Sequence, residues 1–418
     1  MKVLVIGGGG REHAIICALK RSPKVTELLC APGNGGISSD AKCFPEVKAT
    51  DLDGVLAICK SEKPDYVMVA SDDPLALGMV DMLESNGFKA FGPRKNAAEI
   101  ESSKAFAKEF MRRHSIPTAE CEIFSNYADA EKYIRGKGAP IVIKADGLAL
   151  GKGAIVAMTL DEALSAARDM LEGGAFGGAG RTVVVEEYMT GREVTALAFC
   201  DGTHIAMMPP ARDHKRIFDG DKGLNTGGMG VISPVADYTD ELAKTAMDRI
   251  FKPTIDGLRE EGREFRGVIY FEMMLTPSGP KVIEYNARFG DPECETVLPL
   301  LKSDLLDVLI ACRDGKLDET KVEWSGEASC CVMIASGGYP TKYEKGFEIT
   351  GIDGCGATVY HSGTQLKDGK LVTAGGRVLA VVATGETLDK ARADAYAAAE
   401  KIHFEGAYMR HDIGGARR

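Results

Sequence analysis

The stretch that decides the fold reads PKVIEYNARFGDPE, residues 280–293. Its first half has the alternating character of a half-buried β-strand, in which side chains two residues apart point to the same face, so Glu284 and Asn286 share a face. Carboxylate and amide oxygens are hard ligands that suit Mg²⁺. We therefore predict that both residues bind a divalent cation. Arg288 and Asp291 follow in a loop, from which they can hold a small charged substrate.

A preceding strand supplies a further acidic side chain. Residues Val268 to Leu275 read as a strand that is joined to the first one by a short turn-forming segment. If Leu275 pairs with Lys281, Glu272 stands opposite Glu284. Two carboxylates that face each other across a sheet repel, and a cation between them turns this repulsion into a binding site. We therefore expect Glu272 to be a third metal ligand. The alternative is that the glutamates are solvated side chains at the edge of a sheet.

Length and composition indicate a globular protein of two to four domains, because 418 residues exceed a single ordinary core. The net charge of −10 argues against a general nucleic-acid-binding protein. The 11 cysteines show no ligand-like pairing, which is typical of reduced thiols in the cytoplasm. The apolar run Val3–Ile6 ends in glycines, unlike a signal peptide. No apolar run approaches the roughly 18 residues of a membrane-spanning helix, so we expect no membrane partner.

The order of strand-like and helix-like segments divides the chain into four predicted units. Residues 1–103 alternate strands and helices, which indicates a Rossmann-like parallel sheet with helices on both faces. Residues 104–190 form a second unit that a long helix joins to the first. Residues 191–326 contain the strand pair with Glu272 and Glu284, and residues 327–418 are β-rich. The predicted class is a multidomain mixture of α/β and α+β.

Three local expectations accompany this division. A helix is expected from Pro74 to Asn86, and one long helix from Lys95 to His114 leads out of the first unit. The polar, glycine-rich residues 213–230 read as a long unstructured segment. Such a segment inside a compact domain is usually functional or disordered. A solvated charge cluster is the alternative interpretation of residues 213–216.

A first glycine loop, GGGGREH at residues 7–13, follows a strand and opens a helix. The backbone N–H groups of Gly8, Gly9 and Gly10 can approach a phosphate at the helix N-terminus. The G-x-G-x-x-G/A fingerprint of dinucleotide binding fails in every register, so we predict the phosphate of another ligand. A turn that merely requires glycine is the alternative. His13 is expected to cap or pack.

A second glycine loop, KADGLALGKG at residues 144–153, joins two strands and lacks the ending of a Walker A loop. A glycine lid of this kind, with Lys144 and Lys152 beside Gly151 and Gly153, can fold over a triphosphate and neutralise its charge. An ordinary hairpin tip is the alternative.

A third candidate segment, VVVEEY at residues 183–188, is an apolar strand that ends in Glu186, Glu187 and Tyr188. The edge of such a strand can offer backbone hydrogen bonds to an adenine ring. The nearby Glu193 can accept hydrogen bonds from ribose hydroxyls. This signal is weak by itself, because many strands end in glutamate.

Taken together, these residues resemble the ATP-grasp superfamily and, within it, the phosphoribosylamine–glycine ligase family. The Asp-His-Lys-Arg and Asn-Thr-Gly-Gly-Met-Gly elements are specific to this family, whereas Glu-x-Asn is shared across the superfamily. The stretches that carry the resemblance span almost the whole chain: residues 3–13, 144–148, 213–216, 225–230, 286–293, 375–378 and 408–414.

This chain departs from the family pattern in two places. Ser71-Asp72-Asp73 replaces the usual Gly-Pro-Glu, which leaves the role of the acid in that loop open. Phe271-Glu272 replaces the usual Ala-Gly. Other ATP-grasp enzymes have a metal-binding acid on that strand, which agrees with Glu272 as an added ligand.

The resemblance implies an ATP-grasp lid over residues 104–190 and an ATP-grasp core over residues 191–326. It implies a purine-biosynthesis ligase that joins glycine to 5-phosphoribosylamine through a glycyl phosphate. The products are glycinamide ribonucleotide, ADP and phosphate. The implied cofactors are ATP with Mg²⁺ or Mn²⁺, and the implied state is a monomer in the cytoplasm with no nucleic-acid partner.

The resemblance also implies roles for individual residues. Arg288, Asp213 and Lys215 are the expected catalytic residues, Arg288 by holding the glycine carboxylate. ATP is expected to contact Lys104, Lys144, Lys152, Gly151, Gly153, Glu186, Glu187, Tyr188 and Glu193. The other substrates are expected to contact Gly8, Gly9, Gly10, Arg11, Asn225, Gly227, Gly228 and Asp291, with the 5′-phosphate on the first glycine loop. The expected metal ligands are Glu284, Asn286 and Glu272.

Three alternative functions stay open from the sequence. The first is another ATP-grasp ligase or carboxylase that acts on a different acid, which the two family-specific elements disfavour. The second is a dinucleotide-dependent oxidoreductase, which the failed fingerprint disfavours. The third is a non-catalytic nucleotide sensor, which has no need for the metal pair.

Overall fold

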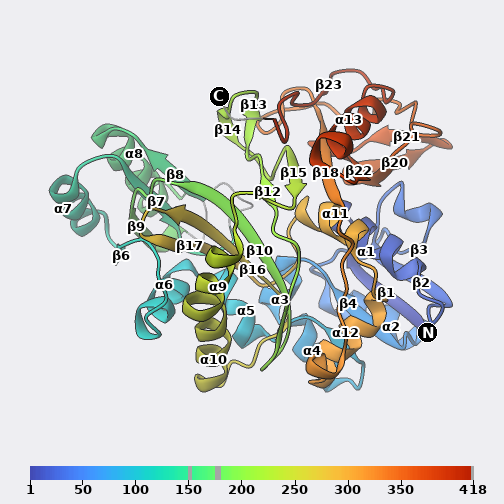
Figure 1. Ribbon diagram of the computed structural model, residues 1–418, viewed down its shortest axis with the longest axis horizontal. Coiled ribbons are helices and arrows are strands. Elements are labelled where there is room, and N and C mark those ends of the chain that lie inside the picture. Colours follow the sequence, from blue (N-terminus) through green and yellow to red (C-terminus); the bar gives the residue numbers. More distant parts are fainter. Residues whose placement is uncertain (149–152, 175–179, 416–418) are drawn as a thin grey trace.

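The computed structural model describes residues 1–148, 153–174 and 180–415. Its N-terminal part, blue in Figure 1, is a parallel sheet with the strand order β3-β2-β1-β4-β5. The strands are β1 (Lys2–Gly7), β2 (Glu27–Pro32), β3 (Lys42–Cys43), β4 (Tyr66–Val69) and β5 (Ala90–Phe91), with α1 (Gly10–Lys20) and α2 (Leu52–Glu62). Val3 and Val5 pack into one apolar cluster, and Leu4 and Ile6 into another. Both faces of the sheet are therefore covered, which confirms the predicted Rossmann-like unit.

The helix expected from Pro74 to Asn86 is two helices, α3 (Asp72–Leu77) and α4 (Met79–Ser85). Gly78 between them has φ +90°, a left-handed conformation that ends α3. The prediction of one continuous helix was wrong because the apolar spacing continues through this glycine.

The long helix expected from Lys95 to His114 is also divided, into α5 (Lys95–Ser102) and α6 (Lys104–Arg113). Ser103 between them is extended, and its hydroxyl accepts a hydrogen bond from the Phe106 N–H at 3.0 Å. A serine in this position caps the second helix. The cap places Lys104 in the first turn of α6, and so gives this lysine a fixed position.

Residues 121–187 form a lid that extends from the body of the molecule, at the left of Figure 1. Its antiparallel sheet has the order β6-β9-β7-β8 and its own apolar cluster. The elements are β6 (Cys121–Phe124), α7 (Tyr127–Lys137), β7 (Ile141–Ala145), β8 (Ala154–Ala157), α8 (Leu160–Leu171) and β9 (Val183–Glu187). The second glycine loop connects β7 and β8, as predicted, and its residues 149–152 lie outside the described part of the chain.

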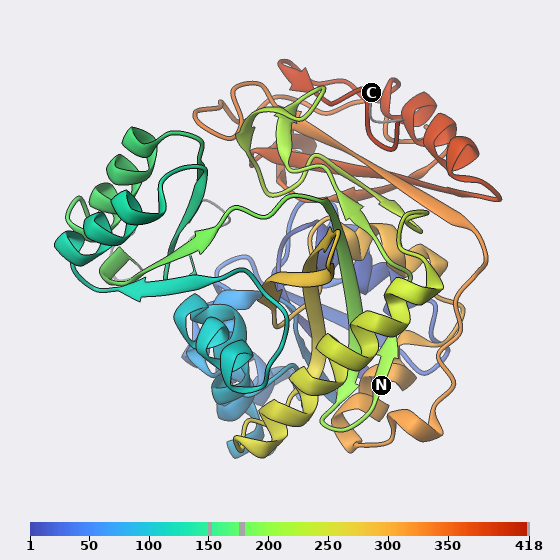
Figure 2. The same ribbon diagram turned by 60° about the vertical axis from the view of Figure 1, so that its left-hand side comes forward.

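The central antiparallel sheet has the order β11-β10-β16-β17 and stands between the lid and the N-terminal sheet in Figure 1, and Figure 2 shows the helices of residues 240–260 in front of it. The strands are β10 (Arg192–Asp201), β11 (Ile205–Met207), β16 (Arg266–Thr276) and β17 (Gly279–Asn286). A helical layer packs on it through contacts such as Phe251 on Phe271, whose ring centroids are 4.4 Å apart. The layer consists of α9 (Asp240–Ala246), the π-helical turn Met247–Phe251 and α10 (Lys252–Glu260).

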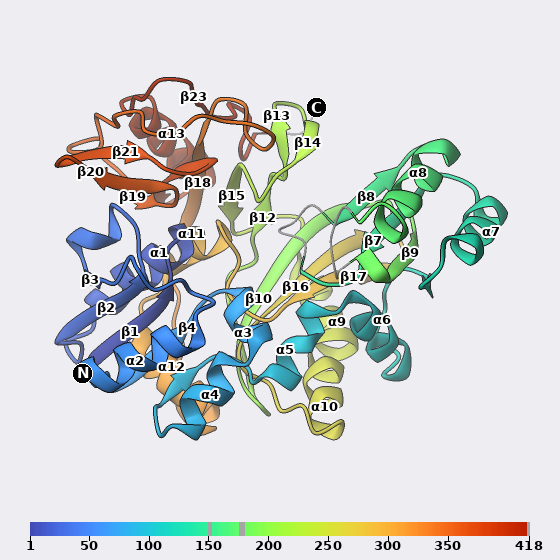
Figure 3. The same ribbon diagram turned by 180° about the vertical axis from the view of Figure 1, so that it is seen from behind.

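Residues 213–230 are not the unstructured segment that their composition suggested. They form β12 (Arg212–Asp213), the small ribbon of β13 (Arg216–Phe218) and β14 (Lys222–Asn225), and the start of β15 (Gly230–Ser233). Figure 3 shows this ribbon between the lid and the C-terminal part. Short strands with many glycines lack the alternation that reveals a strand in sequence.

The C-terminal part is β-rich, as predicted, and its main sheet runs β12-β15-β18-β22-β19 with β23 beside β18. Cys330 and Cys331 lie in different apolar clusters on opposite faces of β18. The remaining elements are α11 (Glu293–Val297), α12 (Leu305–Asp314), β18 (Ala328–Ser336), β19 (Thr358–His361), β20 (Thr364–Lys367), β21 (Lys370–Thr373), β22 (Arg377–Gly385), α13 (Leu388–Ala399) and β23 (Ala407–Tyr408), with short 3₁₀ turns at Ile37–Ser39, Leu298–Leu300 and Leu317–Glu319. Among the residues described, no helix is long and apolar enough to span a membrane.

Candidate active site

Glu272 and Glu284 pair directly across β16 and β17, as predicted. Glu272 is buried, and its Oε1 accepts a hydrogen bond from Lys215 Nζ. Burial raises the pKa of Glu272 to about 7, although Lys215 opposes the shift. Burial also acts to raise the pKa of Glu284, but Lys104, Lys144 and Lys215 outweigh it and lower the pKa to about 2. The two facing carboxylates therefore differ in their affinity for a proton.

The donor set at this pair fits a divalent cation. Two carboxylates face each other, and Asn286, two residues after Glu284 on the same strand, adds an amide oxygen on the same face. The acids repel one another when both are ionised, and a hard cation relieves that repulsion. Lys104 Nζ is 3.9 Å from Glu284 Oε2, so partial neutralisation already comes from α6.

Arg288 is held in place by acids and an amide. Its Nη2 donates to Asn286 Oδ1 at 2.8 Å and lies 2.9 Å from Glu101 Oε1. The other oxygen of Glu101 accepts the Ala287 N–H at 2.7 Å. Among the described residues, Arg288 Nε is buried without a hydrogen-bond partner. Glu101 was missed from the sequence, because it lies on α5 without any motif around it.

The first glycine loop docks onto the loop that follows β17. The Gly9 N–H donates to Glu12 Oε2 at 2.6 Å, and Arg11 Nε donates to Glu12 Oε1 at 2.8 Å. Arg11 Nη1 also donates to the Phe289 carbonyl at 2.9 Å. A Cβ on Gly9 would stand 3.3 Å from Asp291 Oδ2. The structure thus brings Gly9, Arg11 and Asp291 together, as a shared substrate site requires.

Arg377 joins two predicted loops, although no role was predicted for it from the sequence. Its Nη2 lies 2.7 Å from Asp291 Oδ1, and its Nη1 donates to the carbonyls of Asp291, at 2.8 Å, and of Gly227. Burial acts to raise the pKa of Asp291, but Arg377 and Arg11 outweigh it and the pKa is lowered. Arg377 begins β22, so the C-terminal part completes this side of the site. The GGRV motif around it was the signal available in the sequence.

Asp213 and Lys215 enter the cluster from the segment between β12 and β13. Burial raises the pKa of Asp213 well above its usual range, and the carboxylate of Glu293 adds to the effect. Glu293 Oε1 accepts a hydrogen bond from the Tyr270 hydroxyl at 2.9 Å. A Cβ on Gly228 would stand 2.7 Å from Asp213 Oδ1, so only glycine fits there. Asn225 pairs with Arg216 in the β13–β14 ribbon.

A second group of charges lies where the lid meets the core. Lys108 Nζ is 3.1 Å from Glu186 Oε2, and Lys144 Nζ is 3.1 Å from Glu186 Oε1. We call these three residues the lysine–glutamate triad. Burial opposes the ionised form of Glu186, but both lysines outweigh it and lower its pKa. Burial lowers the pKa of Lys108, with Glu186 acting in the opposite direction. Lys108 was missed from the sequence.

The other predicted nucleotide contacts surround this triad. Glu187 Oε1 is 2.9 Å from Lys281 Nζ, and Tyr188 is 39% exposed at the mouth of the lid. Glu193 on β10 pairs with Met274 on β16. Burial acts to lower the pKa of Lys215, but Glu272 and, to a lesser extent, Glu193 outweigh it and raise the pKa. Gly153 precedes β8. Gly151 and Lys152 lie outside the described residues.

The segment Ser71-Asp72-Asp73, expected to be a loop, is the N-terminus of α3, and Asp72 lies near the arginines of the site. Burial acts to raise the pKa of Asp72, but Arg288 and Arg11 outweigh it and lower the pKa. An acidic side chain therefore lies near Arg288 and Arg11, although this segment differs from the usual Gly-Pro-Glu of the family. His13 packs, as expected: its Nδ1 accepts the His361 N–H at 2.8 Å, which leaves the proton on Nε2 for Asp40 at 3.2 Å.

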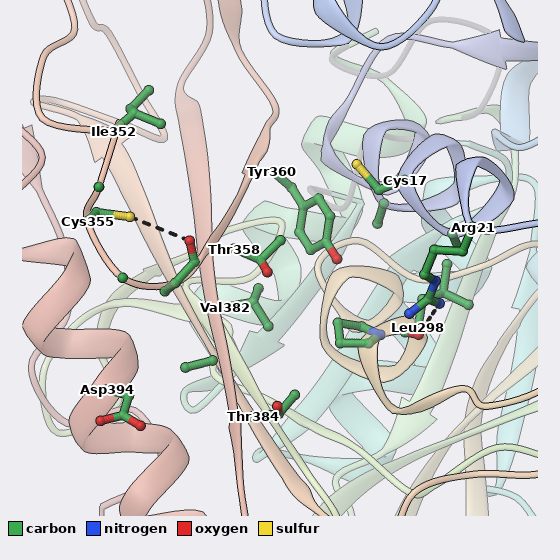
Figure 4. Close-up of a pocket in the computed structure, with 17 residues that line it drawn as sticks. Cys17, Arg21, Leu298, Ile352, Cys355, Thr358, Tyr360, Val382, Thr384 and Asp394 are labelled. Carbon is green, nitrogen blue, oxygen red and sulfur yellow. Dashed lines mark hydrogen bonds between the residues drawn. The ribbon is translucent and has the colours of Figure 1, made fainter.

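A cavity of about 770 Å³ lies apart from this cluster, between α1 and the C-terminal sheet. Figure 4 shows Tyr360, Thr384 and Arg21 around it, with Arg21 Nη2 donating to the Leu298 carbonyl at 3.1 Å. None of the described residues predicted for the site lines this cavity. We therefore assign no step of a reaction to it.

Comparison with known protein families agrees with this arrangement. Models of phosphoribosylglycinamide synthetase match the chain in three parts: the N domain over residues 1–101, the ATP-grasp (A) domain over 102–294 and the C domain over 329–416. The chain belongs to the phosphoribosylglycinamide synthetase family. It is therefore a ligase with an ATP-grasp domain, from a family of purine biosynthesis.

Individual members of the phosphoribosylglycinamide synthetase family agree over the full length. The chain is 47% identical over 420 residues to phosphoribosylamine–glycine ligase of Salmonella typhi, covering 99% of this chain and 98% of that protein. The ligase of Halalkalibacterium halodurans is 46% identical, with coverages of 99% and 96%. The crystal structure of the Thermotoga maritima ligase superposes with a TM-score of 0.87 at 35% identity, covering 99% of this chain and 100% of that one. Biotin carboxylase of Campylobacter jejuni, at 16% identity and TM-score 0.75, shares the fold over 98% of this chain and 92% of its own.

Proposed function

We propose that this chain joins glycine to 5-phosphoribosylamine with ATP, giving glycinamide ribonucleotide, ADP and phosphate. The observation that carries the proposal is the convergence of Gly9, Asp291 and Arg377 beside Arg288 and the acidic pair on β16 and β17. This convergence supports one site that combines a loop for a phosphate, an arginine for a carboxylate and an acidic pair for a metal ion. The ligases of Salmonella typhi, Halalkalibacterium halodurans and Thermotoga maritima are named for phosphoribosylamine and glycine, and they belong to the same family.

Arg288 is the residue that we propose for the glycine carboxylate. Its Nη2 is already used by Asn286 and Glu101, but its buried Nε has no partner among the described residues. A substrate carboxylate can accept a hydrogen bond from that nitrogen. Held there, a carboxylate oxygen attacks the γ-phosphorus of ATP and ADP leaves. The product is glycyl phosphate, an acyl donor.

The second step joins the two substrates. The amine of 5-phosphoribosylamine attacks the carbonyl carbon of glycyl phosphate, the C–O bond to phosphate breaks, and the amine gives up a proton. We propose that Gly8, Gly9, Gly10 and Arg11 hold the 5′-phosphate. Asp291, Asn225, Gly227 and Gly228 complete the substrate side. Asp213 and Lys215 stand beside the reacting groups, so catalysis consists mainly of positioning and electrostatics.

Glu284, Asn286 and Glu272 are the proposed metal ligands, for Mg²⁺ or Mn²⁺. A bound divalent ion would spread the negative charge that develops on the transferred phosphoryl group. For the nucleotide we propose Lys104, Lys144, Gly153, Glu186, Glu187, Tyr188 and Glu193, with Lys152 and Gly151 from outside the described residues. The buried lysines around Glu186 suit a polyanion.

The same proposal includes the domain boundaries, the cellular location and the oligomeric state. We propose domain boundaries at 1–103, 104–190, 191–326 and 327–418. We also propose a cytoplasmic monomer whose partners are the small-molecule substrates.

The proposal is tested by ADP release with glycine present, with and without 5-phosphoribosylamine generated in the assay. ADP release that requires both substrates, together with formation of glycinamide ribonucleotide, is the expected result. ADP release with another acid or amine, and none with this pair, would show a different ATP-grasp ligase.

A further inference from the structure

The lysine–glutamate triad carries more positive than negative charge in a buried place. Lys108 and Lys144 each bring an ammonium group against the single carboxylate of Glu186, and all three side chains are at most 5% exposed. Burial acts to lower the pKa of Lys144, but Glu186, Glu284 and Glu272 outweigh it and raise the pKa, while Lys104 and Lys215 face the last two acids in turn. The two ammonium groups of the triad thus share one carboxylate, and other acids also lie near Lys144. An incoming anion can therefore replace Glu186 as the partner of Lys144 without leaving a buried charge unpaired.

The two lysines are held differently. Lys108 Nζ also donates to the Thr118 hydroxyl at 2.7 Å, and that hydroxyl donates to the Val282 carbonyl at 2.7 Å. Lys144 Nζ donates instead to the Ile283 carbonyl at 3.1 Å, next to Glu284 in the chain. Lys108 is thus anchored on the closed side of Glu186. Lys144 is on the side of the proposed metal ligands.

We propose that Lys108 is a positioning residue for nucleotide binding: it stays on Glu186 as a permanent counterion and thereby frees Lys144 to move to the nucleotide phosphates. The inference rests on the proposed function, which gives Lys144 to ATP. In the protein without nucleotide, Glu186 uses one oxygen for each lysine. When the phosphates arrive, Lys144 exchanges Glu186 for them, and Glu186 keeps Lys108.

Charge balance explains why the exchange requires Lys108. Breaking a buried pair by removing one partner leaves an uncompensated charge and is strongly unfavourable. Without Lys108, the departure of Lys144 would leave the buried Glu186 carboxylate without a counterion, so Lys144 would stay paired with Glu186. A charge-retaining substitution at position 108 keeps Glu186 compensated. Lys108→Arg should therefore preserve the exchange, and Lys108→Met should prevent it.

The test is ATP binding measured by titration calorimetry with Mg²⁺, without glycine or 5-phosphoribosylamine. Lys108→Met should raise the Kd for ATP at least about tenfold. Lys108→Arg, which retains the positive charge beside Glu186, should keep the Kd within about threefold of the unmodified protein. Thr118→Val is the matched control, because it removes the anchor hydroxyl but keeps the charge of Lys108. Its Kd should also stay within about threefold.

Two outcomes overturn the inference. One is that Thr118→Val and Lys108→Met weaken ATP binding equally, which would mean that Lys108 only anchors α6. The other is a Lys108→Arg variant that binds ATP as weakly as Lys108→Met. If Lys108→Met does not fold by circular dichroism, Lys108→Gln takes its place: the same weakening of ATP binding supports the exchange, and unchanged binding contradicts it. Failure of the unmodified protein to bind ATP would instead remove the proposed function.

Discussion

Glu272 on β16 faces Glu284 on β17 because a β-bulge lies between this pair and the turn. Thr276 pairs with Gly279 and Met273 with Val282, so an unbroken ladder would place Glu272 opposite Ile283. The bulge shifts the register by one residue and turns Glu284 to the face of Glu272. The juxtaposition of the buried Glu272 and the half-buried Glu284 is therefore built into the backbone of the hairpin.

The first prediction concerns this pair. Glu284→Gln should lower turnover at least about 100-fold, because it removes a proposed metal ligand. Glu272→Gln should raise the Mg²⁺ concentration for half-maximal activity about tenfold or more. Its stability without metal should change by less than about 1 kcal/mol, because the amide oxygen still accepts from Lys215. Mn²⁺ binding by electron paramagnetic resonance gives a reading independent of activity.

The surface substitution Glu131→Gln serves as the control for both variants, since Glu131 pairs only with the exposed Arg135 among the described contacts. Unchanged metal affinity in Glu272→Gln, with reduced stability, would make Glu272 only the counterion of Lys215. Full removal in Glu272→Ala should be destabilising without metal, because Lys215 then loses its buried partner.

The second prediction separates the glycines of the first loop. Gly9→Ala should fold, because the new Cβ would meet only side-chain oxygens of Glu12 and Asp291, at 3.0 and 3.3 Å. It should raise the KM for 5-phosphoribosylamine about tenfold and leave that for ATP unchanged, since the methyl group hinders approach of the phosphate to the backbone.

Gly8→Ala is the contrasting variant. Its Cβ would stand 2.5 Å from the Gly33 carbonyl oxygen, so the backbone must shift, at a cost of about 1–3 kcal/mol in unfolding free energy. Urea unfolding measures that cost. Equal effects of Gly9→Ala on both KM values would place the phosphate elsewhere.

The sequence predicted local features of this molecule better than its long-range contacts. Four features depend on short-range patterns and were found as expected: the strand with Glu284, the first glycine loop between a strand and a helix, the two strands that flank the second glycine loop, and the β-rich C-terminal part. The facing of Glu272 and Glu284 was also found, but the assumed pairing of Leu275 with Lys281 was wrong: Leu275 pairs with Pro280, and the bulge makes up the difference. The residue pattern of a single strand does not predict a bulge.

The contacts that sequence analysis missed join segments far apart in the chain. Arg377 reaches Asp291 across 86 positions, and Glu101 receives the Ala287 N–H across 186. The divided helices had a visible signal, in Gly78 and in Ser103 three residues before Phe106, but the apolar periodicity outweighed it. Residue types and local spacing cannot specify which distant carboxylate an arginine will meet.

The third prediction tests Arg377 as the link between loops. Arg377→Met should lower the free energy of unfolding by about 3–5 kcal/mol, because it leaves the buried Asp291 carboxylate without its main partner. Arg377→Lys keeps the charge but not the two-pronged contact, and should cost about 1–2 kcal/mol and raise the KM for 5-phosphoribosylamine. Asp291→Asn should suppress most of the effect of Arg377→Met in the double variant. Additive losses would show that the two residues act separately.

The last prediction is a pH dependence of stability that arises at His214. This side chain is 6% exposed, its Nδ1 lies 3.0 Å from the Gly230 carbonyl, and its Nε2 accepts the Gly414 N–H at 3.3 Å. Burial lowers the pKa of His214 to about 4. The unfolded chain takes up a proton below about pH 6.5, whereas the folded chain does so only near pH 4, so stability is full above pH 6.5 and falls as the pH decreases through that window.

The expected loss between pH 7 and pH 5 is on the order of 1–2 kcal/mol for this histidine. His361, whose pKa burial also lowers to about 4, should add a similar amount. His214→Gln retains hydrogen-bonding groups but cannot titrate, so urea unfolding at the two pH values should show a smaller difference than in the unmodified protein. The exposed His403→Gln is the control. An unchanged difference in His214→Gln would mean that His214 is already protonated in the folded state, and that its contact with Gly414 is made differently.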